Sequence, residues 1–200
     1  MFQGTAARPR GADDEPFQVM DIKLSKYPAI LVLTGASGAG KTTLIEELNA
    51  IDIPGVEGIN CDRARMYIGE TSEPSDRQAG ILRYWLTKLG RERTERRLAV
   101  LDTQIRPHIA RDLLDQAGVA LSQIVLVDCD LATRNERLIK ERKQPELANP
   151  QMDCWAAYLR GQADALGLSI IQTGNASLHE SSQTLEAIIN KLLKALGQIR

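Results

Sequence analysis

The chain has 200 residues, which suits one domain with a sizeable core, and its 43% hydrophobic and 26% charged residues are ordinary for a globular protein. The net charge of −1 argues against a protein that coats nucleic acid, and no apolar run approaches the ~18–20 residues of a membrane span. The three cysteines lie far apart without CxxC spacing, which argues against a zinc site and is typical of reduced cysteines, so we expect a cytoplasmic protein.

The first part of the chain differs in composition from the rest. Residues 1–28 mix Gly, Pro, Arg and Asp with few apolar positions. This composition predicts a flexible N-terminal segment and lead-in. A single domain is expected over residues 29–200.

From Ala29 onward, short apolar runs alternate with amphipathic stretches. The runs predict five strands, over residues 29–34, 55–61, 98–102, 123–129 and 168–172. Three of them, the first, third and fourth, are almost continuously apolar, which is typical of strands buried on both faces. Strands that alternate with helices predict an α/β fold with a parallel sheet, in which ligands bind at the carboxyl ends of the strands.

Helical spacing of apolar residues predicts the intervening helices. The first follows the first strand over residues 42–50, and another is expected over residues 76–89. The C-terminal helix has an apolar stripe made of Leu185, Ile188, Ile189, Leu192, Leu193 and Leu196. Ser75 with Gln78, and Ser177 with Glu180, have the spacing of capping boxes at two helix starts.

The segment after the first strand reads Gly35-Ala-Ser-Gly-Ala-Gly-Lys41-Thr42, which satisfies GxxxxGK[ST] between a strand and a helix. Its glycines let the backbone wrap around phosphates, and the next helix adds the positive end of its dipole. The motif predicts binding of ATP and Mg²⁺, with Lys41 on the β- and γ-phosphates and Thr42 on the metal. The expected nucleotide-binding residues are Gly35, Ser37, Gly38, Ala39, Gly40, Lys41, Thr42 and Thr43.

Two classes of P-loop protein are excluded by the residues at the end of the third strand, Asp102-Thr-Gln-Ile105. A switch-type GTPase has Asp-x-x-Gly there and Asn-Lys-x-Asp later, and neither pattern occurs. An ATP-hydrolysing motor has a water-activating Glu where this chain has Thr103. A phosphotransferase is the class that remains.

From about Ala29 to its C-terminus, the chain resembles the P-loop kinases of small molecules and nucleotides. This group includes nucleoside monophosphate, shikimate, gluconate and polynucleotide kinases and chloramphenicol phosphotransferase. Residues 153–172 are similar to AAA-type small kinases. The resemblance implies a three-layer fold with sheet order 2-3-1-4-5, helices on both faces, and a short lid at about residues 137–151.

The same resemblance implies an acceptor site. Asp62-Arg-Ala-Arg65, after the second strand, is similar to the Asp-x-x-Arg that supplies a base and a phosphate-binding Arg in polynucleotide kinases and opens the acceptor helix in adenylate kinases. If the acceptor is a hydroxyl, Asp62 is the candidate base, and a helix cap is its alternative role. The resemblance also implies that Asp102 holds Mg²⁺ and that Arg106 contacts acceptor phosphate, with a solvated surface charge as the alternative for Arg106.

Two further arginines fit the lid of this group. There, one Arg stacks on adenine and another reaches the transferred phosphate, so Arg137 is assigned to the nucleotide and Arg142 to the γ-phosphoryl group. The alternative is an exposed helix with paired surface charges.

These assignments predict an ATP-dependent phosphotransferase that acts on a hydroxyl of a small molecule. Three other functions stay open. One is a nucleoside monophosphate kinase with Arg65 and Arg106 on the acceptor phosphate, one is a polynucleotide 5′-hydroxyl kinase, and one is a non-catalytic nucleotide-sensing module. The acceptor, a small molecule or a nucleotide, and the oligomeric state do not follow from the sequence.

Overall fold

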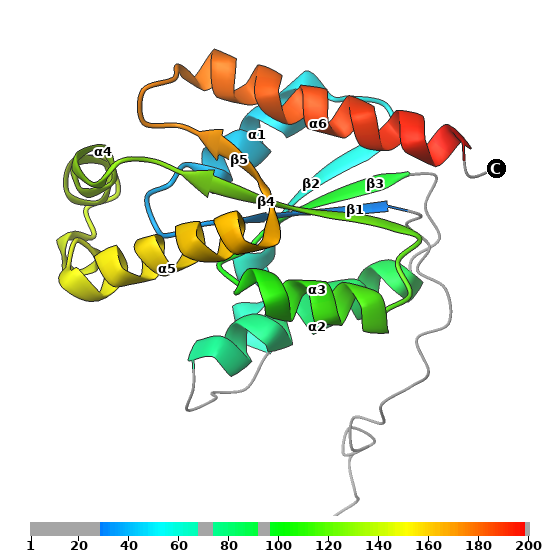
Figure 1. The fold of residues 1–200 in the computed structure, drawn as a ribbon, viewed down its shortest axis with the longest axis horizontal. Coiled ribbons are helices and arrows are strands. Elements are labelled where there is room, and N and C mark those ends of the chain that lie inside the picture. The colour runs from blue at the N-terminus through cyan, green and yellow to red at the C-terminus, as the bar shows by residue number, and fades with distance from the viewer. Residues whose placement is uncertain (1–28, 68–73, 92–96, 199–200) are drawn as a thin grey trace, which may run out of the picture.

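A five-stranded parallel sheet forms the centre of the computed structural model, which describes residues 29–67, 74–91 and 97–198 (Figure 1). The strands are β1 (Ala29–Thr34), β2 (Val56–Asn60), β3 (Leu98–Asp102), β4 (Leu121–Asp128) and β5 (Ser169–Gln172). Their order is β2-β3-β1-β4-β5, and every neighbouring pair is parallel. The predicted fold class and strand order are therefore confirmed. The expected flexible segment, residues 1–28, lies outside the described residues.

Helices cover both faces of the sheet (Figure 1). One face carries α1 (Lys41–Ile51) and α6 (Leu178–Gln198), and the other carries α2 (Pro74–Arg91), α3 (Pro107–Gln116) and α5 (Pro150–Leu166). Shorter helical segments are η1 (Cys61–Tyr67), α4 (Leu131–Glu136), η2 (Arg137–Glu141) and η3 (Pro145–Leu147). The expected lid, residues 137–151, thus spans η2, η3 and the start of α5.

The central strand shows why the sheet is apolar on both faces. All six residues of β1 are buried. Ile30 and Val32 pack into the core beneath α2 and α3, whereas Leu31 and Leu33 pack into the core beneath α1 and α6. Because successive side chains of a strand point to opposite faces, a strand covered on both sides buries every side chain, and the one hydroxyl of β1, Thr34 Oγ1, donates to the Ile105 carbonyl oxygen at 2.6 Å.

One of the two predicted capping boxes is confirmed. The backbone N–H and the hydroxyl of Ser177 both donate to Glu180 Oε2 at 2.8 Å, and the Glu180 N–H donates to Ser177 Oγ at 3.2 Å, just before α6. The prediction for Ser75 is wrong, because α2 begins at Pro74 and Ser75 lies inside the first turn. Proline suits a first helical position, where its missing N–H leaves no bond unmade. Gln78 Oε1 instead accepts a hydrogen bond from Thr103 Oγ1 at 3.3 Å.

The parallel arrangement brings the carboxyl ends of all five strands to one edge of the sheet. The glycine loop follows β1, η1 follows β2, and α4 follows β4 at this edge. This edge therefore carries the candidate site. In the described part of the chain, none of the helices has the length and apolarity needed to cross a bilayer.

Candidate functional site

The loop between β1 and α1 has the backbone of an anion cradle. Gly38 and Gly40 have φ angles of 81° and 92°, in the left-handed region that side chains with a Cβ atom rarely adopt. A Cβ atom on Gly35 would collide with the carbonyl oxygen of Val127, so this position also requires glycine. No side chain caps α1 at Gly40. The first-turn N–H groups of α1 therefore depend on a partner from outside the helix, which is the chemistry of a phosphate site.

Lys41 lies inside this loop. Its side chain is buried, and Nζ donates to the carbonyl oxygens of Gly35 at 2.9 Å and Ala36 at 3.0 Å. Burial lowers the pKa of Lys41, while the charges of Asp102 and Asp62 raise it and that of Arg142 lowers it further. Side chains from α1, β3, η1 and the lid region thus share one electrostatic environment.

Thr42 and Asp102 form the candidate metal site. Thr42 Oγ1 donates to Asp102 Oδ2 at 2.8 Å. Burial raises the pKa of Asp102, against the opposing effects of the Lys41 charge and the Thr42 hydrogen bond. Mg²⁺ takes oxygen ligands and is usually held by one or two protein groups together with water and phosphate. A hydroxyl and a carboxylate side by side fit that pattern, and no group of three or more His, Cys, Asp or Glu that could hold a metal occurs among the described residues.

Asp62 lies in the first turn of η1, directly after β2. Its N–H donates to Asn60 Oδ1 at 3.0 Å, and its side chain is exposed. The Asp62 charge contributes to the raised pKa of Asp102 and opposes the lowered pKa of Lys41, so this carboxylate lies near the loop. Arg65 belongs to the same helical segment, but its side chain lies outside the described part of the structure.

The two predicted lid arginines both lie close to the loop. Arg137 donates from Nη1 to Thr173 Oγ1 at 2.9 Å and from Nη2 to the Thr173 carbonyl oxygen at 2.7 Å, and Nη1 also reaches the Gly38 carbonyl oxygen at 3.4 Å. Thr173 Oγ1 in turn donates to the Ala39 carbonyl oxygen at 2.8 Å. Arg142 is exposed, and its charge lowers the pKa of both Lys41 and Asp102. Thr173 is a contact that sequence reasoning missed, since the pattern around it indicates no more than a turn after the last strand.

Two ion pairs hold α5 against this edge of the sheet. Arg134 of α4 pairs with Asp153 of α5, and the Arg134 side chain is 4% exposed. Arg134 also lies against the loop, because a Cβ atom on Gly38 would come within 3.0 Å of its Cγ. Arg160 Nε donates to the buried Asp128 Oδ2 at 2.7 Å. Nothing in the sequence pattern distinguishes the buried Arg134 from its exposed neighbours.

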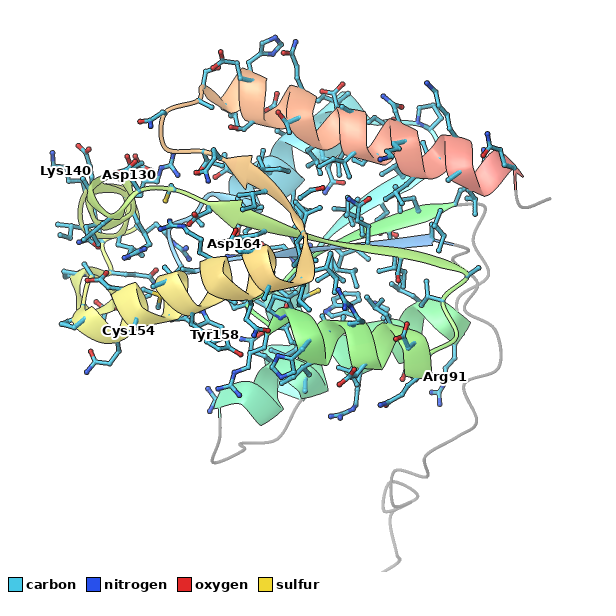
Figure 2. All side chains as sticks on the ribbon, viewed as in Figure 1. Arg91, Asp130, Lys140, Cys154, Tyr158 and Asp164 are labelled. Atoms are coloured by element: carbon cyan, nitrogen blue, oxygen red, sulfur yellow. The ribbon has the colours of Figure 1, made fainter. Side chains whose placement is uncertain are left out.

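Arg106 belongs to a separate group of side chains on the same edge. Its guanidinium carbon is 5.9 Å from the ring centroid of Trp155 and 5.8 Å from that of Tyr158. These two rings stack with centroids 5.5 Å apart and an interplanar angle of 16°. The three side chains line a cavity of about 520 Å³ together with Pro150, Gln151 and Cys154. Figure 2 shows Tyr158 and Cys154 projecting from α5. Sequence reasoning missed both aromatic residues. Residues three apart on a helix lie on the same face, so the spacing of Trp155 and Tyr158 could have predicted that their rings lie side by side.

Comparison with known proteins agrees with this architecture. A family model described as AAA domain matches residues 30–162. Solved structures similar to this chain include a shikimate kinase from Acinetobacter baumannii in complex with shikimate, at 17% identity and a TM-score of 0.55, covering 84% of this chain and 95% of that chain. A gluconokinase from Sinorhizobium meliloti 1021 aligns at 16% identity and a TM-score of 0.54, covering 87% and 99%.

A third similar structure is an APS kinase, CysC, from Mycobacterium tuberculosis in complex with AMPPNP and APS. It aligns at 17% identity and a TM-score of 0.50, covering 81% of this chain and 97% of that chain. At these identities the likeness shows the fold, which is that of P-loop kinases. No curated protein matches the chain.

Proposed function

Because the chain belongs to the AAA domain family and has the fold of P-loop kinases, we propose that it is an ATP-dependent phosphotransferase that moves the γ-phosphoryl group to a hydroxyl of a small-molecule acceptor. The observation that carries this proposal is the glycine loop with the buried Lys41 inside it and the Thr42–Asp102 hydrogen bond beside it, within reach of the charges of Asp62 and Arg142. A module that only senses a nucleotide has no need of a carboxylate and a guanidinium on the acceptor side of the loop.

Binding of the nucleotide rests on the loop. The uncapped first-turn amides of α1 and the Lys41 ammonium would hold the β- and γ-phosphates. Arg137, anchored on Thr173 beside the loop, supports a role on the nucleotide. Thr42 and Asp102 would hold Mg²⁺, which neutralises charge on the phosphates when it is bound.

In the transfer step, the acceptor oxygen forms a bond to the γ-phosphorus while the bond from that phosphorus to the β–γ bridging oxygen breaks. ADP leaves with the electron pair, and the proton of the acceptor hydroxyl passes to Asp62. Charge that spreads over the γ-phosphoryl oxygens is stabilised by Arg142. The exposure of both side chains supports these roles, because a general base and a lid residue must be reachable from the acceptor side.

The proposal is tested in two stages. Production of ADP from MgATP is first screened over sugars, nucleosides and antibiotics to find the acceptor. Asp62→Asn is then expected to lower the transfer rate by about 10²–10⁴-fold, the usual contribution of a general base, with little change in ATP affinity. The matched control is Asp112→Asn, an exposed carboxylate on α3 that should leave both quantities unchanged.

Two outcomes would contradict the proposal. An unchanged transfer rate in Asp62→Asn removes the role of this residue as base. Tight MgATP binding without ADP production on any acceptor favours the nucleotide-sensing module.

A further inference from the structure

The cavity beneath α5 has the size and lining of a ligand site. Its volume of about 520 Å³ lies within the ~300–1,000 Å³ typical of small-molecule pockets. Two aromatic rings and a proline supply apolar surface, and Arg106 supplies one positive charge. Trp155 and Tyr158 stack on each other, and a further flat ring can extend this stack by lying on an outer face of the pair.

The guanidinium of Arg106 contacts two aromatic rings, but at least one of its N–H groups has no acceptor among the described residues. The guanidinium carbon lies at nearly equal distance from both rings, an arrangement that attracts the cation and fixes its orientation. Nε is buried and has no hydrogen-bond partner among the described residues. A buried N–H without an acceptor is costly, and no described residue offsets the charge of this guanidinium, so an anionic or carbonyl oxygen of a ligand in the cavity would be favoured beside it.

The position of the cavity connects it to the proposed reaction. Arg106 is the N-cap residue of α3, four residues after Asp102, and the aromatic pair lies between the first turns and the middle of α5. Figure 1 shows α5 and α3 on the same face of the sheet. Helix α3 begins at the edge where β3 ends, which is the edge that carries the phosphate loop.

We propose that this cavity is the acceptor pocket and that it selects a planar aromatic anion, with the ring on Trp155 and Tyr158 and a carboxylate or phosphate on Arg106. The substrate class follows from the lining: an aromatic ring gains a stacking contact with the pair that a saturated ring lacks, and an uncharged molecule leaves the Arg106 guanidinium without a counterion. This inference rests on the proposed phosphotransferase function. The acceptor hydroxyl is then a substituent of the aromatic anion or of a sugar attached to it.

Cys154 allows occupancy of the cavity to be measured without ATP. It lines the cavity and is exposed, whereas Cys61 and Cys129 are buried. The rate of alkylation of Cys154 by iodoacetamide, followed by peptide mass spectrometry, therefore reports whether a probe fills the pocket. Two sets of probes are compared. In the first, the aromatic anion is 3-hydroxybenzoate, its saturated counterpart is 3-hydroxycyclohexanecarboxylate and its uncharged counterpart is 3-hydroxybenzamide. In the second, the aromatic anion is thymidine 5′-monophosphate and its uncharged counterpart is thymidine.

The expected result is that at least one aromatic anion slows the alkylation. Its saturated counterpart should bind about 3–10-fold more weakly, the loss that accompanies removal of an aromatic contact. Arg106→Gln should raise the half-protecting concentration of the anion about tenfold or more. Tyr158→Leu, at a residue that is 39% exposed and can be replaced with little risk to folding, should remove the preference for the flat ring.

The matched control is Arg111→Gln, an exposed arginine further along α3 that lies outside the cavity. In this variant, the aromatic anion should slow the alkylation of Cys154 as much as it does in the unchanged protein. Lys41→Ala should lose ATP binding and keep the protection by the aromatic anion, so failure of the proposed function and failure of this inference give different results.

Three results would overturn the inference. In the first, neither aromatic anion protects Cys154. In the second, the saturated or uncharged counterparts protect equally, or Arg106→Gln has no effect. In the third, Cys154 resists alkylation in the free protein, which elutes as a dimer, so that the cavity is an interface between two copies of the chain.

Discussion

Lys41 and Asp102 are both buried, and the charge of each one stabilises the charged form of the other. Burial shifts the pKa of Lys41 down and that of Asp102 up, in both cases toward the neutral form. The opposite charge of the partner acts against this shift in each case. The consequence is a site in which the Lys41 ammonium can still attract a triphosphate. The Asp102 carboxylate, however, is more easily protonated than an exposed aspartate.

The raised pKa of Asp102 predicts how metal-dependent binding varies with pH. Asp102 must be ionised to hold Mg²⁺, and a raised pKa means that it takes up a proton at a higher pH than the ordinary aspartate value of about 3.9. At Mg²⁺ concentrations well below saturation, where the metal does not itself lower the pKa, the extra ATP affinity supplied by Mg²⁺ should therefore decline on acidification with a midpoint above that value. Titration of a fluorescent ATP analogue, with and without Mg²⁺ across the acid range, measures it.

Asp102→Asn is the control for this pH dependence. It should bind the analogue with little gain from Mg²⁺ at any pH, because the amide cannot ionise. A decline centred at the value of an ordinary exposed aspartate, or a decline that persists in Asp102→Asn, would assign the titration to another group.

Residues whose positions depend on the local backbone were the ones that the sequence could predict. The glycines of the loop, Lys41 and Thr42 lie together in one motif, so their arrangement follows from a few consecutive residues. Thr173 and Arg134 could not be found in this way. Their contacts with the loop depend on how β5 and α4 pack against it, which no short pattern records.

Among the elements, α4 and α5 are joined by a contact that a change in one side chain can break. Asp153 of α5 is the carboxylate partner of Arg134, whose side chain is 4% exposed while that of Asp153 is 38% exposed. A buried guanidinium that loses its partner is left without compensation for its lost hydration. The contact therefore links the segment that bears Arg137 and Arg142 to the body of the domain.

Asp153→Asn is expected to lower the free energy of unfolding by about 1–3 kcal/mol, less than the ~3–5 kcal/mol of a fully buried pair because Asp153 is partly solvated. The midpoint of urea unfolding measures this loss. Asp164→Asn, at an exposed position in the same helix, is the matched control and should change the midpoint little. Equal effects of the two substitutions would show that the ion pair contributes nothing.

Element types were predictable because each pattern repeats over many residues, whereas element ends were set by local chemistry. The bounds of β1 and β3 match their apolar runs, since both strands are buried along their whole length. Strand β4 begins at Leu121, two residues earlier than expected, because its first residues pair with β1 although they are less buried. Helix α2 begins at Pro74, two residues before the expected start.

At the scale of the molecule, the parallel sheet followed from alternation and the strand order from the resemblance, but the aromatic cavity followed from neither. The rings of α5 and Arg106 before α3 come together only after both helices have packed on the same face of the sheet. The loop, in contrast, is contacted by Arg137 of η2, by Thr173 after β5 and by Asp102 of β3 through Thr42. A nucleotide bound at the loop would therefore contact a segment that is packed against η2, β3 and the end of β5.

Binding of MgATP should therefore stabilise the domain as a whole. A ligand that binds only the folded state at about 100 times its Kd adds about 2.7 kcal/mol, and each kcal/mol shifts the Tm of a domain of this size by about 2–4 °C. A rise in Tm of about 5–10 °C is expected, measured by calorimetry at saturating MgATP. Lys41→Ala should show little of this rise, because the loop loses its ammonium, while Arg111→Gln should show all of it. A Tm that does not respond to MgATP, or that rises equally in Lys41→Ala, would mean that the glycine loop is not where the nucleotide binds.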